Sequence, residues 1–133
     1  MPALVVPENA TILEGILLEP AAMQTTPTGL SLATLEVEHR SDMVDVQPLS
    51  RYELRMVVLA IGPLAEACRT LPPGSHLRVE GRLNQRRWIR AGKTRWGRTE
   101  LVARHIESKP PADPEVAGSA GGQSKKEMVY GEE

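Results

Sequence analysis

Apolar and polar residues alternate along much of the chain, a pattern typical of β-strands that turn one face to a core. Five segments are predicted as strands: residues 10–19, 30–39, 52–61, 76–88 and 99–106. The alternation is cleanest in the fourth, where apolar residues and Gly81 occupy every second position from Leu77 to Leu83. The third is apolar on both faces in its C-terminal half, which predicts a central strand or a subunit contact.

One short helix is predicted, over residues 64–71. Pro63 suits the first helical position, and Pro72 and Pro73 cannot continue a helix. Five strands with one short helix between the third and fourth is the element order of the OB-fold, a small all-β Greek-key barrel. We therefore predict an OB-fold over residues 9–107, after a short N-terminal extension of residues 1–8.

The last part of the chain differs in composition. Residues 108–133 are rich in Pro, Gly, Ser and charged residues, and almost no apolar residue precedes Met128. Such a segment buries too little apolar surface to offset the entropy lost on ordering, so a disordered C-terminal tail is predicted. The apolar runs of the chain are far shorter than the ~20 residues of a membrane span, and its start lacks the basic residues of an export signal.

The single cysteine, Cys68, lies in the predicted helix and is expected to be a small buried apolar residue. It permits neither an intrachain disulfide nor a cysteine-based zinc cluster. A reducing cytoplasm fits this usage, and we expect a cytoplasmic, nucleoid-associated protein without membrane contact.

The net charge of −1 over 133 residues hides a strong asymmetry. Residues 1–80 have net charge −5, residues 81–106 have +7 and residues 107–133 have −3. Trp88 and Trp96 also lie in the basic segment, and only Tyr52 and Tyr130 are aromatic elsewhere. The chain therefore contains one cationic, aromatic element, which we predict to be a loop over residues 89–97 with the strand before it.

Cations and flat side chains together are what a single-stranded nucleic-acid site requires. The cations replace the counterions condensed on phosphates, and unstacked bases lie on the aromatic rings. The alternative is a solvated hairpin tip with Trp88 folded onto the barrel. Trp88 is the more ambiguous of the two, whereas Trp96, beside Gly97, is the expected base platform.

Specific stretches of the chain resemble the family of bacterial primosomal replication protein N, a branch of the single-stranded DNA-binding protein superfamily. They are Thr26-Pro27-Thr28-Gly29, Leu35-Glu36-Val37-Glu38-His39-Arg40-Ser41, Val57-Val58-Leu59-Ala60-Ile61-Gly62 and Pro73-Gly74-Ser75-His76-Leu77-Arg78-Val79-Glu80-Gly81. The last is shared with the superfamily in general, whereas the Glu-His-Arg-Ser element favours the primosomal branch. The resemblance covers about residues 9–107.

The resemblance implies a homodimer of OB-folds, without enzymatic activity or cofactor, that binds single-stranded DNA. It also implies a role in assembling the replication-restart primosome at stalled forks, with the restart helicase and helicase-loading proteins as partners. The DNA-binding residues that it implies by position are Arg82, Arg86, Arg87, Trp88, Arg90, Lys93, Arg95, Trp96 and Arg98, with Arg40 and, on the third strand, Tyr52. Two departures matter: the chain has no Phe, and its basic loop is longer and richer in Arg and Trp than the family suggests.

Several alternatives stay open on the sequence alone. Arg40 either contacts DNA or pairs with Glu36 or Glu38. The three histidines have no metal-site spacing, and no motif makes a case for catalysis. The chain ends without the apolar pair that closes replicative single-stranded DNA-binding proteins, which ranks a divergent protein of that class second. A protein-interaction adaptor that uses the same Arg and Trp residues is the alternative from another class, because these residues are enriched at protein interfaces too.

Overall fold

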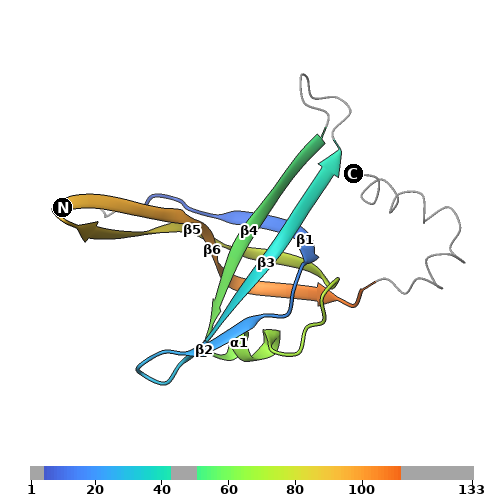
Figure 1. Ribbon diagram of the computed structural model, residues 1–133. Coiled ribbons are helices and arrows are strands. Elements are labelled where there is room, and N and C mark those ends of the chain that lie inside the picture. Colours follow the sequence, from blue (N-terminus) through green and yellow to red (C-terminus); the bar gives the residue numbers. More distant parts are fainter. Residues whose placement is uncertain (1–4, 43–50, 112–133) are drawn as a thin grey trace, which may run out of the picture.

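The computed structural model describes residues 5–42 and 51–111, and within them the chain forms six strands and one short helix (Figure 1). The elements are β1 (Thr11–Leu17), β2 (Ala22–Thr25), β3 (Ser31–Asp42), β4 (Arg51–Ile61), α1 (Pro63–Cys68), β5 (His76–Arg90) and β6 (Lys93–Lys109). In this part of the chain, no helix is long and apolar enough to cross a membrane. The predicted tail falls largely on residues 112–133, outside the described residues.

The strands form one sheet in the order β1-β5-β6-β4-β3-β2, and a further pairing of β1 with β3 closes it into a barrel. β1 lies within the predicted first strand, and β2 follows it as a short strand that was not predicted; both are antiparallel to β3. Pro20 separates them, since proline has no N–H to give to a sheet. The expected five-stranded OB barrel with its helix between the third and fourth strands is thus confirmed, with β2 as an additional short strand.

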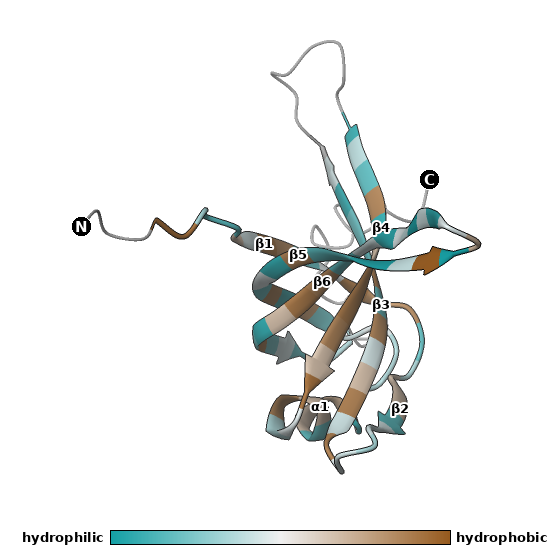
Figure 2. Ribbon diagram, turned by 90° about the vertical axis from the view of Figure 1, so that its left-hand side faces the viewer, coloured by the Kyte–Doolittle hydropathy of each residue, from teal (hydrophilic) through white to brown (hydrophobic). Residues whose placement is uncertain are grey.

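The core lies where the inward faces of the strands meet under α1. Its fully buried side chains include Leu17, Leu35, Val58, Val79 and Leu101. Cys68 is buried among them, and desolvation raises the pKa of its thiol. Figure 2 shows the apolar strand segments gathered in the barrel, while the outer ends of β3 and β4 are largely polar. The prediction of a buried, apolar Cys68 is confirmed.

Two glycines mark places where strands approach too closely for a side chain. A Cβ on Gly15 would lie 2.5 Å from the carbonyl oxygen of Glu38, where β1 crosses β3. A Cβ on Gly81 would lie 2.1 Å from the carbonyl oxygen of Val102, at a register shift between β5 and β6. Closure of this small barrel therefore depends on glycine at both positions.

Some predicted boundaries were wrong. The helix ends at Cys68 rather than Leu71, β5 ends two residues later than predicted, and β6 begins six residues earlier and ends three residues later than predicted. Most importantly, the predicted basic loop over residues 89–97 is not a loop. It is the tip of the β5–β6 hairpin, closed by a two-residue turn at Ala91 and Gly92. Both turn residues have positive φ, 51° and 75°, as in the hairpin turn that matches the natural twist of two strands.

A pH titration will test the hydrogen bonds that Glu66 of α1 accepts. Glu66 accepts hydrogen bonds from the Arg69 guanidinium, at 2.9 Å, and from the Ser31 hydroxyl. These bonds, with Arg69 first, lower the pKa of Glu66 from 4.5 to about 2. Because the pKa is lower in the folded state, this contact stabilises the protein above pH 4.5, and the stabilisation is lost as pH falls from there through 2. NMR titration of the carboxyl carbon should show the low pKa and its return toward 4.5 in Arg69→Ala; an ordinary pKa in the unmodified protein would contradict these hydrogen bonds.

Candidate nucleic-acid interface

The outer halves of β5 and β6, residues 82–98, form a two-stranded ribbon that projects from the barrel (Figure 1), here called the arm. The backbone register pairs Arg90 with Lys93, Trp88 with Arg95 and Asn84 with Glu100. Directly paired residues lie on one face of a ribbon, and successive residues of a strand alternate between faces. The register therefore assigns each arm side chain to a face.

The two faces of the arm differ sharply in chemistry. One face, called the cationic face, carries Arg82, Arg86, Trp88, Arg90, Lys93, Arg95 and Arg98. The opposite face, called the apolar face, carries Leu83, Arg87, Ile89 and Trp96. Six of the seven cations of the arm thus lie together, and they share their face with one of the two tryptophans.

A register shift helps to build the cationic face. Gln85 pairs with Thr99, and Arg87 pairs with Trp96. The two residues are two positions apart on β5, but their partners are three positions apart on β6, so β6 has one extra residue here. The extra residue lets Arg98 share a hollow with Arg86 and Trp88. The Trp88 ring crosses Gly97, where a Cβ would lie 3.4 Å from ring atom Cζ3. Glycine here leaves room for the indole to lie across the neighbouring strand.

The cationic face continues onto the outer surface of the barrel. β4 runs parallel to β6, with Val57 beside Glu100 and Leu59 beside Val102. A hollow of about 260 Å³ lies at this junction, here called the junction hollow. Its lining residues are Thr34, Val57, Leu59, Arg86, Trp88, Gly97, Arg98 and Glu100. An apolar floor, an indole and two guanidinium groups are thus brought together.

Glu100 is the acidic residue of this hollow and is only 6% exposed. Its Oε2 accepts hydrogen bonds from Asn84 Nδ2, at 3.0 Å, and from Arg86 Nε, at 3.3 Å. A buried carboxylate needs such partners, because burial without them is costly. The pair also fixes the direction of the Arg86 side chain, which is otherwise 62% exposed.

On the apolar face, the Arg87 guanidinium lies 5.9 Å from the centroid of the Trp96 ring, within range of a cation–π interaction. Trp96 is 60% exposed and Ile89 is 71% exposed. Trp96, expected to be the base platform of a loop, therefore lies in a strand and points away from the other cations. The structure groups Trp88 with those cations.

Two sequence-predicted site residues lie away from the arm. Arg40 and Tyr52 belong to the outer ends of β3 and β4, a second ribbon that projects from the barrel in another direction (Figure 1). Arg40 forms an ion pair with Glu38, at 3.8 Å, which is one of the two roles considered for it. Glu38 also forms an ion pair with Arg55, whose Nε lies 3.3 Å from Glu38 Oε2. The charge of this ribbon is thereby largely balanced.

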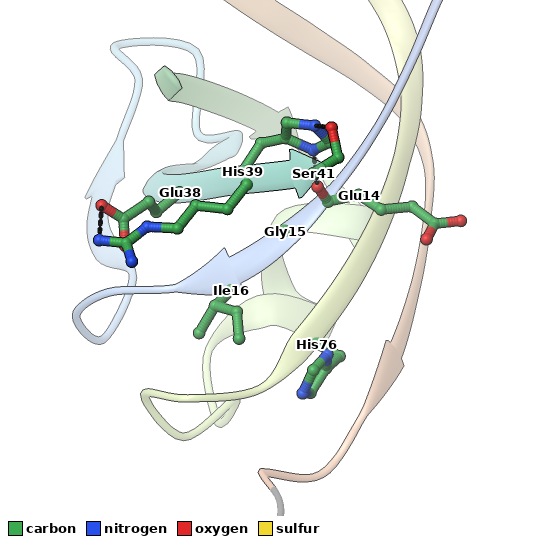
Figure 3. A pocket seen from close by; sticks show the side chains of 8 residues that line it. Glu14, Gly15, Ile16, Glu38, His39, Ser41 and His76 are labelled. Carbon is green, nitrogen blue, oxygen red and sulfur yellow. Dashed lines mark hydrogen bonds and ion pairs between the residues drawn. The ribbon is translucent and has the colours of Figure 1, made fainter. Parts of the chain in front are cut away.

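The Glu-His-Arg-Ser element lines a pocket where β1 crosses β3 (Figure 3). His39 Nδ1 lies 2.7 Å from the carbonyl oxygen of Glu14, and its Nε2 lies 2.9 Å from the Ser41 hydroxyl. If Nδ1 carries the proton, it donates to the carbonyl and Nε2 accepts from Ser41. His39 therefore ties β1 to β3 at the crossing.

Sequence reasoning missed the junction hollow and its acidic residue. Two signals pointed to them: Glu100 is the lone acid among residues 81–106, and β4 is apolar on both faces. Val58 and Ala60 face the core, while Val57 and Leu59 form the floor of the hollow. Both apolar faces of β4 are thus explained by contacts within one chain, without a subunit contact. β4 lies between β6 and β3 in the sheet, so the prediction of a central strand is confirmed.

Comparisons with known proteins identify the family and the fold of the chain. Residues 9–93 match a family model whose description is "Another single-strand binding protein family". The replication restart proteins PriB of Bordetella pertussis and Bordetella parapertussis are each 34% identical to the chain over 73 residues, 55% of this chain and 68% of theirs.

Among solved structures, the wild-type single-stranded DNA-binding protein from Thermus aquaticus superposes with a TM-score of 0.65 and 26% identity. The match covers 77% of this chain and 50% of that one, so the present chain corresponds to half of its length.

Proposed function

The chain belongs to the single-strand binding protein family and, within it, to the replication restart protein PriB family, and from this membership we propose that it binds single-stranded DNA on the cationic face of the arm. It acts there as a binding protein in replication restart and not as an enzyme. The observation that carries the proposal is the segregation of six cations and Trp88 onto one face.

The physical case for that face is direct. Arginine and lysine side chains replace the counterions condensed on phosphates, and this release drives binding. Trp88 offers a flat surface for a base in the middle of these cations. Since residues 1–80 carry net charge −5 and residues 107–133 carry −3, phosphates are repelled from the rest of the chain. Arg40 and Tyr52 remain proposed as secondary contacts on the second ribbon.

Family membership also supports a role in assembling the restart primosome, with the restart helicase and the helicase-loading proteins as proposed partners. We further propose a homodimer. Ile12 on β1 is 58% exposed. β1 pairs with β3 only at Ile16 and Leu17, so within the described residues no strand pairs with the second edge of Thr11–Gly15, where only the Glu14 carbonyl is bonded, to His39. Sedimentation at micromolar concentration should show twice the 14.6 kDa chain mass; a monomer would overturn the dimer.

The apolar face supports a second candidate, a protein-interaction adaptor. Leu83, Ile89 and Trp96 are exposed together there, next to Arg87. Trp and Arg are the residues most enriched at interface hot spots. On this candidate the apolar face is the working surface and DNA is incidental.

Alanine substitution of each tryptophan separates the two candidates. Trp88→Ala should weaken binding of a single-stranded oligonucleotide about tenfold, because a stacked base contributes about 1–3 kcal/mol. Trp96→Ala is its matched control and should leave the affinity within about twofold. Fluorescence anisotropy with a labelled oligonucleotide gives both values. A loss confined to Trp96→Ala, or no loss in either variant, would contradict the assignment of DNA to the cationic face.

A further inference from the structure

We propose that the junction hollow binds one unstacked nucleobase and selects bases with an exocyclic amino group, namely cytosine, adenine or guanine. This inference rests on the proposed function, since it says which part of the strand the hollow receives. The residues that carry it are Trp88, Val57, Leu59 and Glu100.

The shape and lining of the hollow suit a single base. Its volume of about 260 Å³ lies below the range of about 300–1,000 Å³ typical of drug-sized ligands. Val57 and Leu59 give it an apolar floor and are 8% and 6% exposed. The Trp88 indole, 47% exposed, stands beside them and can cover the flat face of a base.

Glu100 gives the hollow an edge that accepts hydrogen bonds. An ionised carboxylate is an acceptor only, and both hydrogen bonds from Asn84 and Arg86 end on Oε2. Within residues 5–42 and 51–111, no side chain or backbone group donates to Oε1. This oxygen is therefore available to a donor that enters the hollow.

The chemistry of the bases then decides which one fits. Carboxylates accept from the exocyclic N4 amino group of cytosine, the pairing that Glu and Asp use in base recognition. Adenine and guanine also carry amino groups, whereas uracil and thymine present a carbonyl oxygen at the position of the cytosine amine. A carbonyl next to Glu100 would place two acceptors against each other.

The position of Glu100 also explains why a surface that binds phosphates contains a carboxylate. Glu100 stands alone against eight cations among residues 81–106, and at the surface it would only repel the backbone. It lines the hollow instead and is only 6% exposed, whereas the Arg86 side chain beside it is 62% exposed. The backbone phosphates can therefore pair with the exposed guanidinium group, while a base that enters the hollow can reach Glu100.

The sharpest test compares oligodeoxycytidine with oligodeoxyuridine of equal length at pH 8, because the two bases differ at C4 by an amine against a carbonyl. The unmodified protein should bind the cytidine strand about five- to tenfold more tightly. In Glu100→Gln this ratio should fall to about one. Glu107→Gln is the matched control: it makes the same change on the same strand, at a side chain 61% exposed that contacts His105 and does not line the hollow. It should keep the ratio.

Each other outcome has a definite meaning. If Glu100→Gln weakens binding of both strands equally, Glu100 only positions Arg86 and the inference is wrong. If the unmodified protein binds both strands equally well, the inference is wrong and the proposed function stands. If it binds neither strand, the proposed function itself fails. Circular dichroism of each variant shows that the barrel is folded, so a loss of selectivity cannot be taken for unfolding.

Discussion

Replacing Arg90, Lys93 and Arg95 together by alanine is expected to lower the affinity for a single-stranded oligonucleotide about 100-fold at ~0.1 M salt. All three lie on the cationic face near the hairpin turn. Each phosphate contact on a single strand contributes about 0.7 to the slope of log affinity against log salt concentration. Three lost phosphate contacts therefore reduce the magnitude of this slope by about 2. Because ~0.1 M is one decade below 1 M salt, that reduction corresponds to a loss of about two decades of affinity at ~0.1 M.

The control for this triple variant makes an equal change of net charge elsewhere. Arg55, Arg69 and Arg78 lie off the arm, and each forms an ion pair with a glutamate. Their joint replacement by alanine should change the affinity by less than about fivefold and leave the salt slope nearly unchanged. Equal losses in the two triple variants would mean that DNA responds to overall charge alone, against a site on the arm.

The largest effect on stability is expected from Gly81→Ala. The new Cβ would lie 2.1 Å from the carbonyl oxygen of Val102 and 2.8 Å from its carbonyl carbon, both backbone atoms of the neighbouring strand. Relief requires β5 and β6 to separate at the point where the barrel closes. We expect a loss of about 3 kcal/mol, the upper end for overpacked sites, and a fall in Tm of about 15 °C.

Gly97→Ala is the matched control for this variant. It also places a methyl group in the β5–β6 hairpin, but its nearest neighbours are Trp88 Cζ3 at 3.4 Å and the Arg86 carbonyl oxygen at 3.5 Å. A small movement of the indole accommodates it, so Tm should change by only a few degrees. Thermal unfolding followed by circular dichroism measures both. A Gly81→Ala protein as stable as Gly97→Ala would contradict the close approach of the two strands.

Much of the fold could be predicted because local and tertiary preferences agree along the strands. The alternation that ends at Leu83 places Leu77 and Val79 in the core, as found, and Pro63 starts α1 at its first position. The two-residue turn was missed because Ala91 takes a positive φ of 51° that its side chain disfavours. Without an Asn-Gly or Asp-Gly signal, the sequence pattern predicts a loop over residues 89–97 instead of a hairpin tip.

The candidate site could be predicted only in its composition. Charge and aromatic content point to the segment that forms the arm, but a loop over residues 89–97 has no faces, so the sequence favours Trp96 as the base platform and does not show that Trp88 shares a face with the cations. Their separation depends on the register of β5 against β6, including the extra residue near Gly97. The junction hollow depends on the parallel pairing of β4 with β6. Such long-range pairings leave little trace in a local pattern.

The central claim, that this protein binds single-stranded DNA, is tested most directly by titrating the unmodified protein into a labelled oligonucleotide with and without excess duplex competitor. The account predicts tight binding that duplex does not displace. If about 5 phosphates are contacted by each subunit, the slope of log affinity against log salt concentration should be about −3.5. Binding that is insensitive to salt, or that duplex competes away as readily as single strands do, would contradict it.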